Sequence, residues 1–308
     1  MERTQCFREG IDRLVRLFYA RIMNIQNISA RMADWMADPG NNSLGPDLNL
    51  PAFDVPLVGC ASGDDPLFSF LKKDIGPDFY WTPAQAFVLA YPESDAVGAD
   101  LSVVSWVLPQ TRHTRKAHGM NKEMPSAEWS RARHYGEKVN EALRRFVVGL
   151  FAEVGVEACA PALLPSWTRA ESPRYGFAST WSERHTAHVC GLGTFGLSDG
   201  LITPRGKAVR VGSVIVRERL APTPRPYTAH NEWCLFHTGG KCRACIKRCP
   251  AGAISEKGHD KIKCKNYIRS ITAPYVEENQ LGFRVNSCGL CQVRVPCESR
   301  NPTVKRAK

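Results

Sequence analysis

Cysteine is the residue type whose number and spacing most clearly indicate chemistry in this sequence. The chain has twelve cysteines, and eight of them fall between Cys234 and Cys297. Evenly scattered cysteines would suggest a disulfide framework, whereas one dense group with C-x-x-C units suggests bound metal. The other four have no paired spacing, and we expect them to be dispensable for metal binding: Cys6, Cys60, Cys159 and Cys190.

The central motif of the group is a C-x2-C-x3-C-P run at residues 242–250. Bacterial ferredoxins carry C-x2-C-x2-C-x3-C-P, in which the fourth cysteine binds the other of two iron–sulfur clusters. At the position of the first ferredoxin cysteine this chain has Gly239, and the nearest earlier cysteine is Cys234. Because the intervening residues can form a wider loop, Cys234 is expected to take the missing place.

The ferredoxin crossover divides the eight cysteines into two sets of four, which predicts two 4Fe–4S clusters. The first set is Cys234, Cys242, Cys245 and Cys297. The second set is Cys249, Cys264, Cys288 and Cys291. Two alternatives stay open: a pair of four-cysteine zinc sites, and His237 in place of Cys234 as a ligand. Zinc sites need neither the C-x3-C-P element nor interleaved sets, so the sequence favours the clusters.

The composition indicates a basic chain without a membrane span. The formal net charge is +11, and two oxidised clusters with their thiolates would lower it to about +7. Such a charge suits an acidic redox partner or nucleic acid, although the Lys and Arg residues are not interleaved with aromatic residues. No stretch approaches the ~20 apolar residues of a membrane helix, and the N-terminus lacks an apolar secretion signal. We therefore expect a cytoplasmic protein.

The rest of the chain contains the elements that must position these cysteines. Apolar residues at helical spacing predict helices over 11–23, 126–154 and 180–190, the last ending at Gly191. Thr82 and Pro83 predict the start of a further helix, and 39–56 has the composition of a loop. Apolar and β-branched runs predict strands over 101–108, 159–163, 201–203 and 209–216, and the turn at 204–207 predicts that the last two form a hairpin.

The order of these elements indicates two structural units, as the chain length also suggests. Strands and helices alternate before residue 225 or so, which is typical of an α/β or α+β domain. Pro222, Pro224 and Pro226 form a stiff linker into the cysteine-rich part. The expected domains are therefore 1–226 and 227–308.

The residues upstream of the cysteines resemble a known signature. The segment 188–206, with its Gly-Leu-Gly turn, and the strand 209–214 look like the stretch ahead of the ferredoxin module in epoxyqueuosine reductases and reductive dehalogenases. Glu183 matches a glutamate of that family, and 131–143 is similar to its Arg/Tyr-rich helix. The resemblance spans roughly residues 100–300.

This resemblance implies an α+β protein, with a nitroreductase-like α/β domain that binds cobalamin followed by a bacterial ferredoxin-like two-cluster domain. The implied enzyme is an iron–sulfur reductase that passes electrons through its clusters to a corrinoid, which reduces an electrophilic substrate. Flavodoxin or ferredoxin would be the electron donor, and tRNA is a further implied partner. The implied cofactor-binding residues are Gly191, Leu192, Gly193, Phe195, Gly196, Leu201 and Thr203.

The chain departs from the family at the proton donor, so the catalytic residue is left open. Epoxyqueuosine reductases carry an aspartate shortly before the glutamate, whereas 176–182 contains no carboxylate. Glu171, Tyr175 and Tyr227 are the nearby candidates. A 4Fe–4S electron carrier or assembly protein without cobalamin is therefore the alternative function. The G-x-G-x-x-G run at 191–196 also fits dinucleotide binding, but it follows an expected helix instead of a strand.

Overall fold

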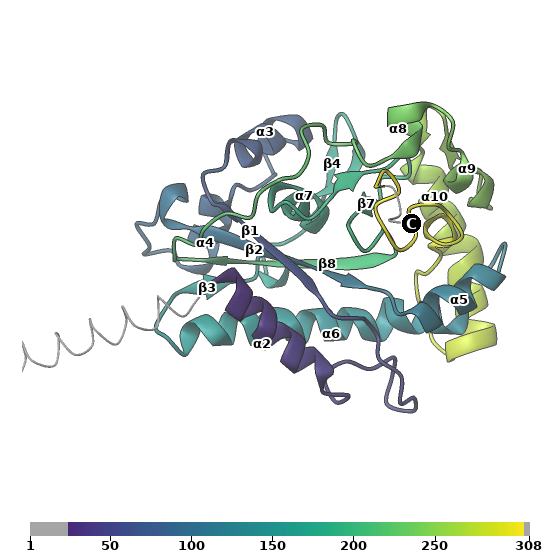
Figure 1. Ribbon diagram of the computed structural model, residues 1–308, viewed down its shortest axis with the longest axis horizontal. Helices are drawn as coiled ribbons and strands as arrows, with labels where there is room; N and C mark the ends of the chain where they lie inside the picture. Colours follow the sequence, from purple (N-terminus) through teal and green to yellow (C-terminus); the bar gives the residue numbers. More distant parts are fainter. Residues whose placement is uncertain (1–23, 305–308) are drawn as a thin grey trace, which may run out of the picture.

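A four-stranded antiparallel sheet lies at the centre of the structure (Figure 1), in the order β1-β2-β8-β3. The computed structural model describes residues 24–304, so the helix expected over 11–23 lies outside the described residues. The strands are β1 Leu57–Ser62, β2 Ser102–Pro109, β3 Ala158–Cys159 and β8 Val209–Val216. Val104 of β2 stands opposite Cys60 on one side and Val214 on the other, which fixes the register.

Strand β2 is the middle of the core because every one of its residues is buried. Its side chains alternate, as the pleat requires. Val104, Trp106 and Leu108 join one hydrophobic cluster, whereas Val103 faces a second cluster on the other side of the sheet. The strand expected over 101–108 is confirmed.

Helices cover both faces of the sheet (Figure 1). One face carries α2 Ile25–Ala37 and α6 Ala127–Ala152, and the other carries α3 Pro66–Ile75, α4 Pro83–Ala90 and α7 Glu183–Val189. Helix α5, Arg112–Met120, continues from β2. Ser126 begins α6 by accepting a hydrogen bond from the Trp129 amide, and Thr82 begins α4 in a capping box. The expected helices at these two places are confirmed.

Three expectations for the first 226 residues need correction. The strand 201–203 does not pair with 209–216: β8 pairs along its whole length with β2 and at Ile215 and Val216 with β3. Instead β7 Leu201–Ile202 pairs with β6 Thr194–Phe195. Helix α7 is shorter than 180–190, and near residue 160 the strand ends at Cys159 because a 3-10 turn follows. The structure also adds a hairpin, β4 Arg169–Ser172 with β5 Gly176–Ser179, in a region without a clear period.

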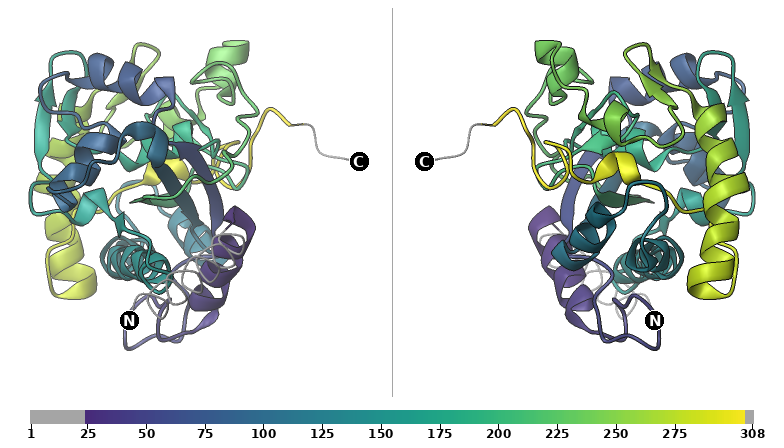
Figure 2. Two further views of the ribbon diagram at one scale, coloured as in Figure 1. Left: turned by 90° about the vertical axis from the view of Figure 1, so that its left-hand side faces the viewer. Right: turned by 90° about the vertical axis from the view of Figure 1, so that its right-hand side faces the viewer.

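The cysteine-rich part is built from short helices and small turns. Its elements are α8 Leu235–Gly239, α9 Ala244–Arg248, β9 Ile254–Ser255, β10 Gly258–His259, α10 Lys261–Tyr267, a π turn Ile268–Thr272, α11 Ala273–Val276 and a π turn Glu277–Leu281. Figure 2 shows the helical stretch 261–281 upright along one side of the molecule. From there the chain returns toward the cysteine loops through the 3-10 turn Leu290–Gln292.

The described chain is thus a mixed helix-and-sheet protein. All strand pairs found between residues 24 and 304 are antiparallel, which is the α+β arrangement. Within the same residues, none of the helices has the length and apolar character needed to cross a membrane.

Candidate functional site

Short helices and turns position the eight clustered cysteines. Cys234 is the residue before α8, Cys245 lies in α9, and Cys249 ends α9. Cys264 lies on α10, and the remaining cysteines follow on the returning segment: Cys288, Cys291 and Cys297. Each of the eight is a free thiol. The chain therefore brings cysteines from three separate segments into one region.

The first set of thiols surrounds Cys297. Burial raises the pKa of Cys297 to about 11, and Cys234, Cys245 and Cys242 act on it in the same direction. The pKa of Cys245 is also raised, chiefly by burial and further by Cys234 and Cys242. These are the four cysteines of the first expected set.

The second set lies between α9, α10 and the returning segment. Burial raises the pKa of Cys264 to about 11, and Cys291 and Cys249 add to the shift. Burial likewise raises the pKa of Cys288 to about 11, with Cys264 and Cys249 as its neighbours. Burial raises the pKa of Cys291 to about 12. Cys288 of its own set and Cys245 of the first set contribute to this rise. The two sets therefore adjoin at Cys291.

Metal coordination would change the protonation state of these thiols. Thiols with raised pKa values stay protonated near neutral pH, whereas a bound metal ion deprotonates its cysteine ligands outright. In residues 24–304 no three His, Cys, Asp or Glu side chains are arranged around a single ion. His237, the alternative ligand, lies on the wall of a neighbouring cavity. Iron binding by the eight cysteines stays a prediction.

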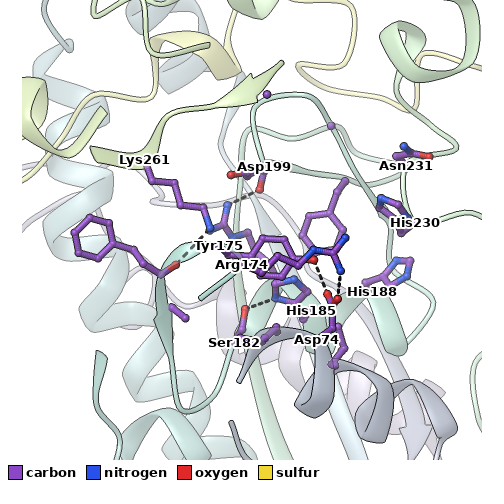
Figure 3. A pocket seen from close by; sticks show the side chains of 18 of the residues that line it. Asp74, Arg174, Tyr175, Ser182, His185, His188, Asp199, His230, Asn231 and Lys261 are labelled. Atoms are coloured by element: carbon purple, nitrogen blue, oxygen red, sulfur yellow. Dashed lines mark hydrogen bonds and ion pairs between the residues drawn. The ribbon is translucent and has the colours of Figure 1, made fainter. Parts of the chain in front are cut away.

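That cavity has a volume of about 1010 Å³ and opens between α3, the β4–β5 hairpin, the start of α7 and the cysteine-rich part (Figure 3). Aromatic side chains form part of its wall: Trp167, Tyr175, Phe177, Phe195 and Tyr227. Cationic side chains form another part: Arg133, Arg169, Arg174, Arg184, Arg225, Lys257, Lys261, Lys265 and Arg269. The volume lies at the upper end of the range for small-molecule sites.

A carboxylate enters this cavity from α3. The Tyr175 hydroxyl and the Arg174 guanidinium both donate hydrogen bonds to Asp74 (Figure 3). Burial raises the pKa of Tyr175 to about 12, and the Asp74 carboxylate raises it further. Lys261 sits 5.4 Å from the centre of the Tyr175 ring. The sequence alone does not indicate Asp74, because it lies on a helix about 100 residues away in the chain and no local pattern marks this contact.

Two histidines of α7 also line the cavity, and both are neutral near pH 7. Burial, together with Arg184, lowers the pKa of His185 to about 3, and its Nδ1 lies 2.7 Å from Ser182 Oγ. Burial also lowers the pKa of His188, whose Nδ1 lies 2.8 Å from the Gly193 carbonyl oxygen. These histidines were not among the expected site residues.

The glycine turn forms less of the cavity wall than expected. Phe195 and Gly196 line the cavity. The other five expected cofactor-binding residues are not among its lining residues: Gly191, Leu192, Gly193, Leu201 and Thr203. Leu192 and Leu201 pack into a hydrophobic cluster instead.

The pairing of β6 with β7 explains why Gly193 does not line this cavity. A Cβ atom on Gly193 would lie 2.3 Å from the Ile202 carbonyl oxygen, so glycine is needed here for the hairpin.

The remaining candidates lie at different distances from the cavity. Tyr227 lines it and donates its hydroxyl to the His188 carbonyl, whereas Glu171 is not a lining residue. Glu183 is half-buried and does not line the cavity. It accepts a 3.0 Å hydrogen bond from Arg144 and a 2.5 Å hydrogen bond from Ser213. Glu183 thus joins α7 to α6 and β8.

Comparison with known proteins gives one curated relative and several solved structures. The relative, named epoxyqueuosine reductase and found in Francisella cf. novicida (strain Fx1), is 32% identical over 125 residues, which are 39% of this chain and 33% of the relative. The resemblance seen in the sequence is confirmed by this relative. No family model matches the chain.

The solved structures carry the names of the same reductases. An epoxyqueuosine reductase in complex with an epoxyqueuosine-modified tRNA-Tyr stem loop is 17% identical with a TM-score of 0.44, and the match covers 89% of this chain and 66% of that one. A catabolic reductive dehalogenase is 13% identical with a TM-score of 0.47, covering 87% and 36%. The chain spans about a third of the curated relative it matches and less than two thirds of the dehalogenase.

Proposed function

We propose that this chain is an iron–sulfur reductase with two 4Fe–4S clusters. The observation that carries the proposal is one cluster of side chains in which cysteines from distant segments pack together: Cys234, Cys245, Cys249, Cys291 and Cys297. The proposed ligands are Cys234, Cys242, Cys245 and Cys297 for one cluster and Cys249, Cys264, Cys288 and Cys291 for the other. In this proposal, residues 1–226 form a nitroreductase-like domain and residues 227–308 a ferredoxin-like domain.

The neighbouring cavity is the proposed place of a corrinoid and an electrophilic substrate. Its volume and its aromatic wall suit a large flat ligand, and Phe195 and Gly196 would contact it. When bound, the clusters would supply single electrons and the corrinoid a reducible cobalt centre. The cationic wall suits an anionic substrate, and the family resemblance makes a modified nucleoside in tRNA the first one to test. A flavodoxin or ferredoxin is the proposed donor.

The chain itself would supply the proton that a reduced product needs. Tyr175 holds a proton on its hydroxyl oxygen, because its pKa of about 12 keeps it protonated near neutral pH. Asp74 fixes the direction of that hydroxyl. Asp74 and Tyr175 would thus supply the carboxylate and the proton in place of the family aspartate, which the segment 176–182 lacks.

The cavity proposal predicts that Ala178→Trp abolishes cobalamin binding. Ala178 lies on β5 and lines the cavity, and a strand position accepts tryptophan, so the indole would occupy the ligand's space. The measurement is the visible spectrum of anaerobic protein after incubation with cobalamin and gel filtration. Wild-type protein should retain about one cobalamin per chain and Ala178→Trp less than a tenth of that.

The matched control is Glu171→Trp on the same hairpin, because Glu171 is exposed and does not line the cavity. This control should bind like the wild type. Wild-type protein that retains no cobalamin would favour the electron-carrier alternative. Equal binding by wild type and Ala178→Trp would place the ligand elsewhere.

A further inference from the structure

A buried lysine, Lys207, lies where the two sets of cysteines meet. Only 3% of its surface is exposed. Its ammonium donates a 2.9 Å hydrogen bond to Ser198 Oγ, and its backbone amide donates a 2.8 Å hydrogen bond to the Cys297 carbonyl. Lys207 is therefore attached to the cysteine-rich part through its main chain, and to the turn that contains Ser198 through its side chain.

The turn before Lys207 holds it in this place. Thr203 and Gly206 exchange backbone hydrogen bonds of 3.0 and 2.9 Å. Gly206 has φ +84°, and a Cβ atom on it would lie 2.2 Å from the Glu298 carbonyl oxygen. The turn thus packs directly on the returning segment, and Lys207, the next residue, is buried.

The charge of Lys207 has no carboxylate partner. Among the ion pairs of residues 24–304, none includes Lys207. Ser198, which accepts the hydrogen bond from its ammonium, follows Leu197, and Leu197 packs in one cluster with Cys234 and Cys245. In keeping with this position, burial lowers the pKa of Lys207 but the nearby cysteines raise it above its usual value: Cys297, Cys291, Cys245 and Cys234. An isolated buried ammonium is very costly, and the cluster-bound thiolates of the proposed function would be the anions that compensate it.

We propose that Lys207 is a countercharge built into the fold for the two iron–sulfur clusters, and that it raises their reduction potentials. The inference rests on the proposed function, because it requires clusters on these thiolates. A reduced cluster carries one more negative charge than an oxidised one, so a fixed nearby cation stabilises the reduced form. Three of the four cysteines belong to the first set and Cys291 to the second. The effect should therefore be larger on the cluster of Cys234, Cys242, Cys245 and Cys297.

The test is a redox titration of both clusters, followed by electron paramagnetic resonance, in anaerobically reconstituted full-length protein. Lys207→Met removes the charge and keeps the length of the side chain, whereas Lys207→Arg keeps the charge and is the matched control. In Lys207→Met, the reduced-to-oxidised ratio of the first cluster at a fixed potential should fall tenfold or more, which is about 59 mV for a one-electron couple. Lys207→Arg should titrate near the wild type.

The outcomes separate this inference from the proposed function. If wild-type and Lys207→Met clusters have equal reduction potentials, Lys207 is not a countercharge. The proposal of two clusters is unaffected by that result. Wild-type protein without 4Fe–4S signals would overturn both. If Lys207→Met and Lys207→Gln take up no iron but Lys207→Arg does, the positive charge is required and the inference is supported. Loss of iron in all three variants would show that Lys207 matters only for packing.

Discussion

Replacing Cys249 with alanine is expected to remove iron from both cluster sites, although Cys249 is a proposed ligand of only one. Cys249 ends α9, whose Cys245 belongs to the other set, and its Sγ accepts a 3.3 Å hydrogen bond from the Ala253 amide. The turn after α9 thus holds the two cysteine loops in register. Since ligand binding and folding are coupled in such modules, iron should fall from about eight to well under four per chain, with poor soluble yield.

Cys159→Ala is the matched control for this prediction. Cys159 is also buried, with a pKa raised to about 12 by burial, but it lies at the end of β3 in the sheet. Cysteine commonly behaves as a small buried hydrophobe, so its iron content should equal that of the wild type. A well-folded Cys249→Ala protein with one intact cluster of four irons would show that the two sites fold independently.

The largest effect on stability is expected at Arg144. Its guanidinium is buried and pairs with Glu183 at 3.0 Å and Glu137 at 3.4 Å. Arg144→Met would leave Glu183 buried without its cation, which costs about 3–5 kcal/mol. The urea midpoint of the anaerobic holoprotein should fall accordingly, and the double variant Arg144→Met/Glu183→Gln should lose less than the two single changes together.

The neighbouring Arg145 provides the control. Its side chain is 65% exposed and lies 4.0 Å from Glu141, and exposed pairs of this kind contribute less than about 1 kcal/mol. Arg145→Met should therefore unfold near the wild-type midpoint. If Arg144→Met unfolds there too, the buried network does not hold α7 against α6.

The parts of the fold that the sequence predicts well depend on local signals. Helix α6 has its apolar spacing and its Ser126 cap, β2 its continuous apolar run, and α4 its Thr82 cap and proline. The pairing of β7 was predicted wrongly because strand partners depend on which sheet edges the rest of the chain has already occupied.

The candidate site also combines residues that the sequence predicts with residues that it does not. The cysteine sets are predicted from the spacing of the cysteines and a crossover rule, and they stay a prediction. Asp74 and Lys207 could not be found from the sequence. Asp74 on α3 contacts Tyr175 in the turn between β4 and β5. Lys207 contacts Cys297 only because the returning segment packs on the turn before Lys207. Contacts between residues far apart in the chain leave no periodicity or short motif.

The most direct test of the account is a count of iron, acid-labile sulfide and zinc in anaerobically purified protein. Two 4Fe–4S clusters predict about eight iron and eight sulfide per chain, with no stoichiometric zinc. A result of about four iron and four sulfide per chain would mean a single cluster, and would contradict the division of the cysteines into two sets. Stoichiometric zinc without sulfide would contradict the iron–sulfur assignment altogether.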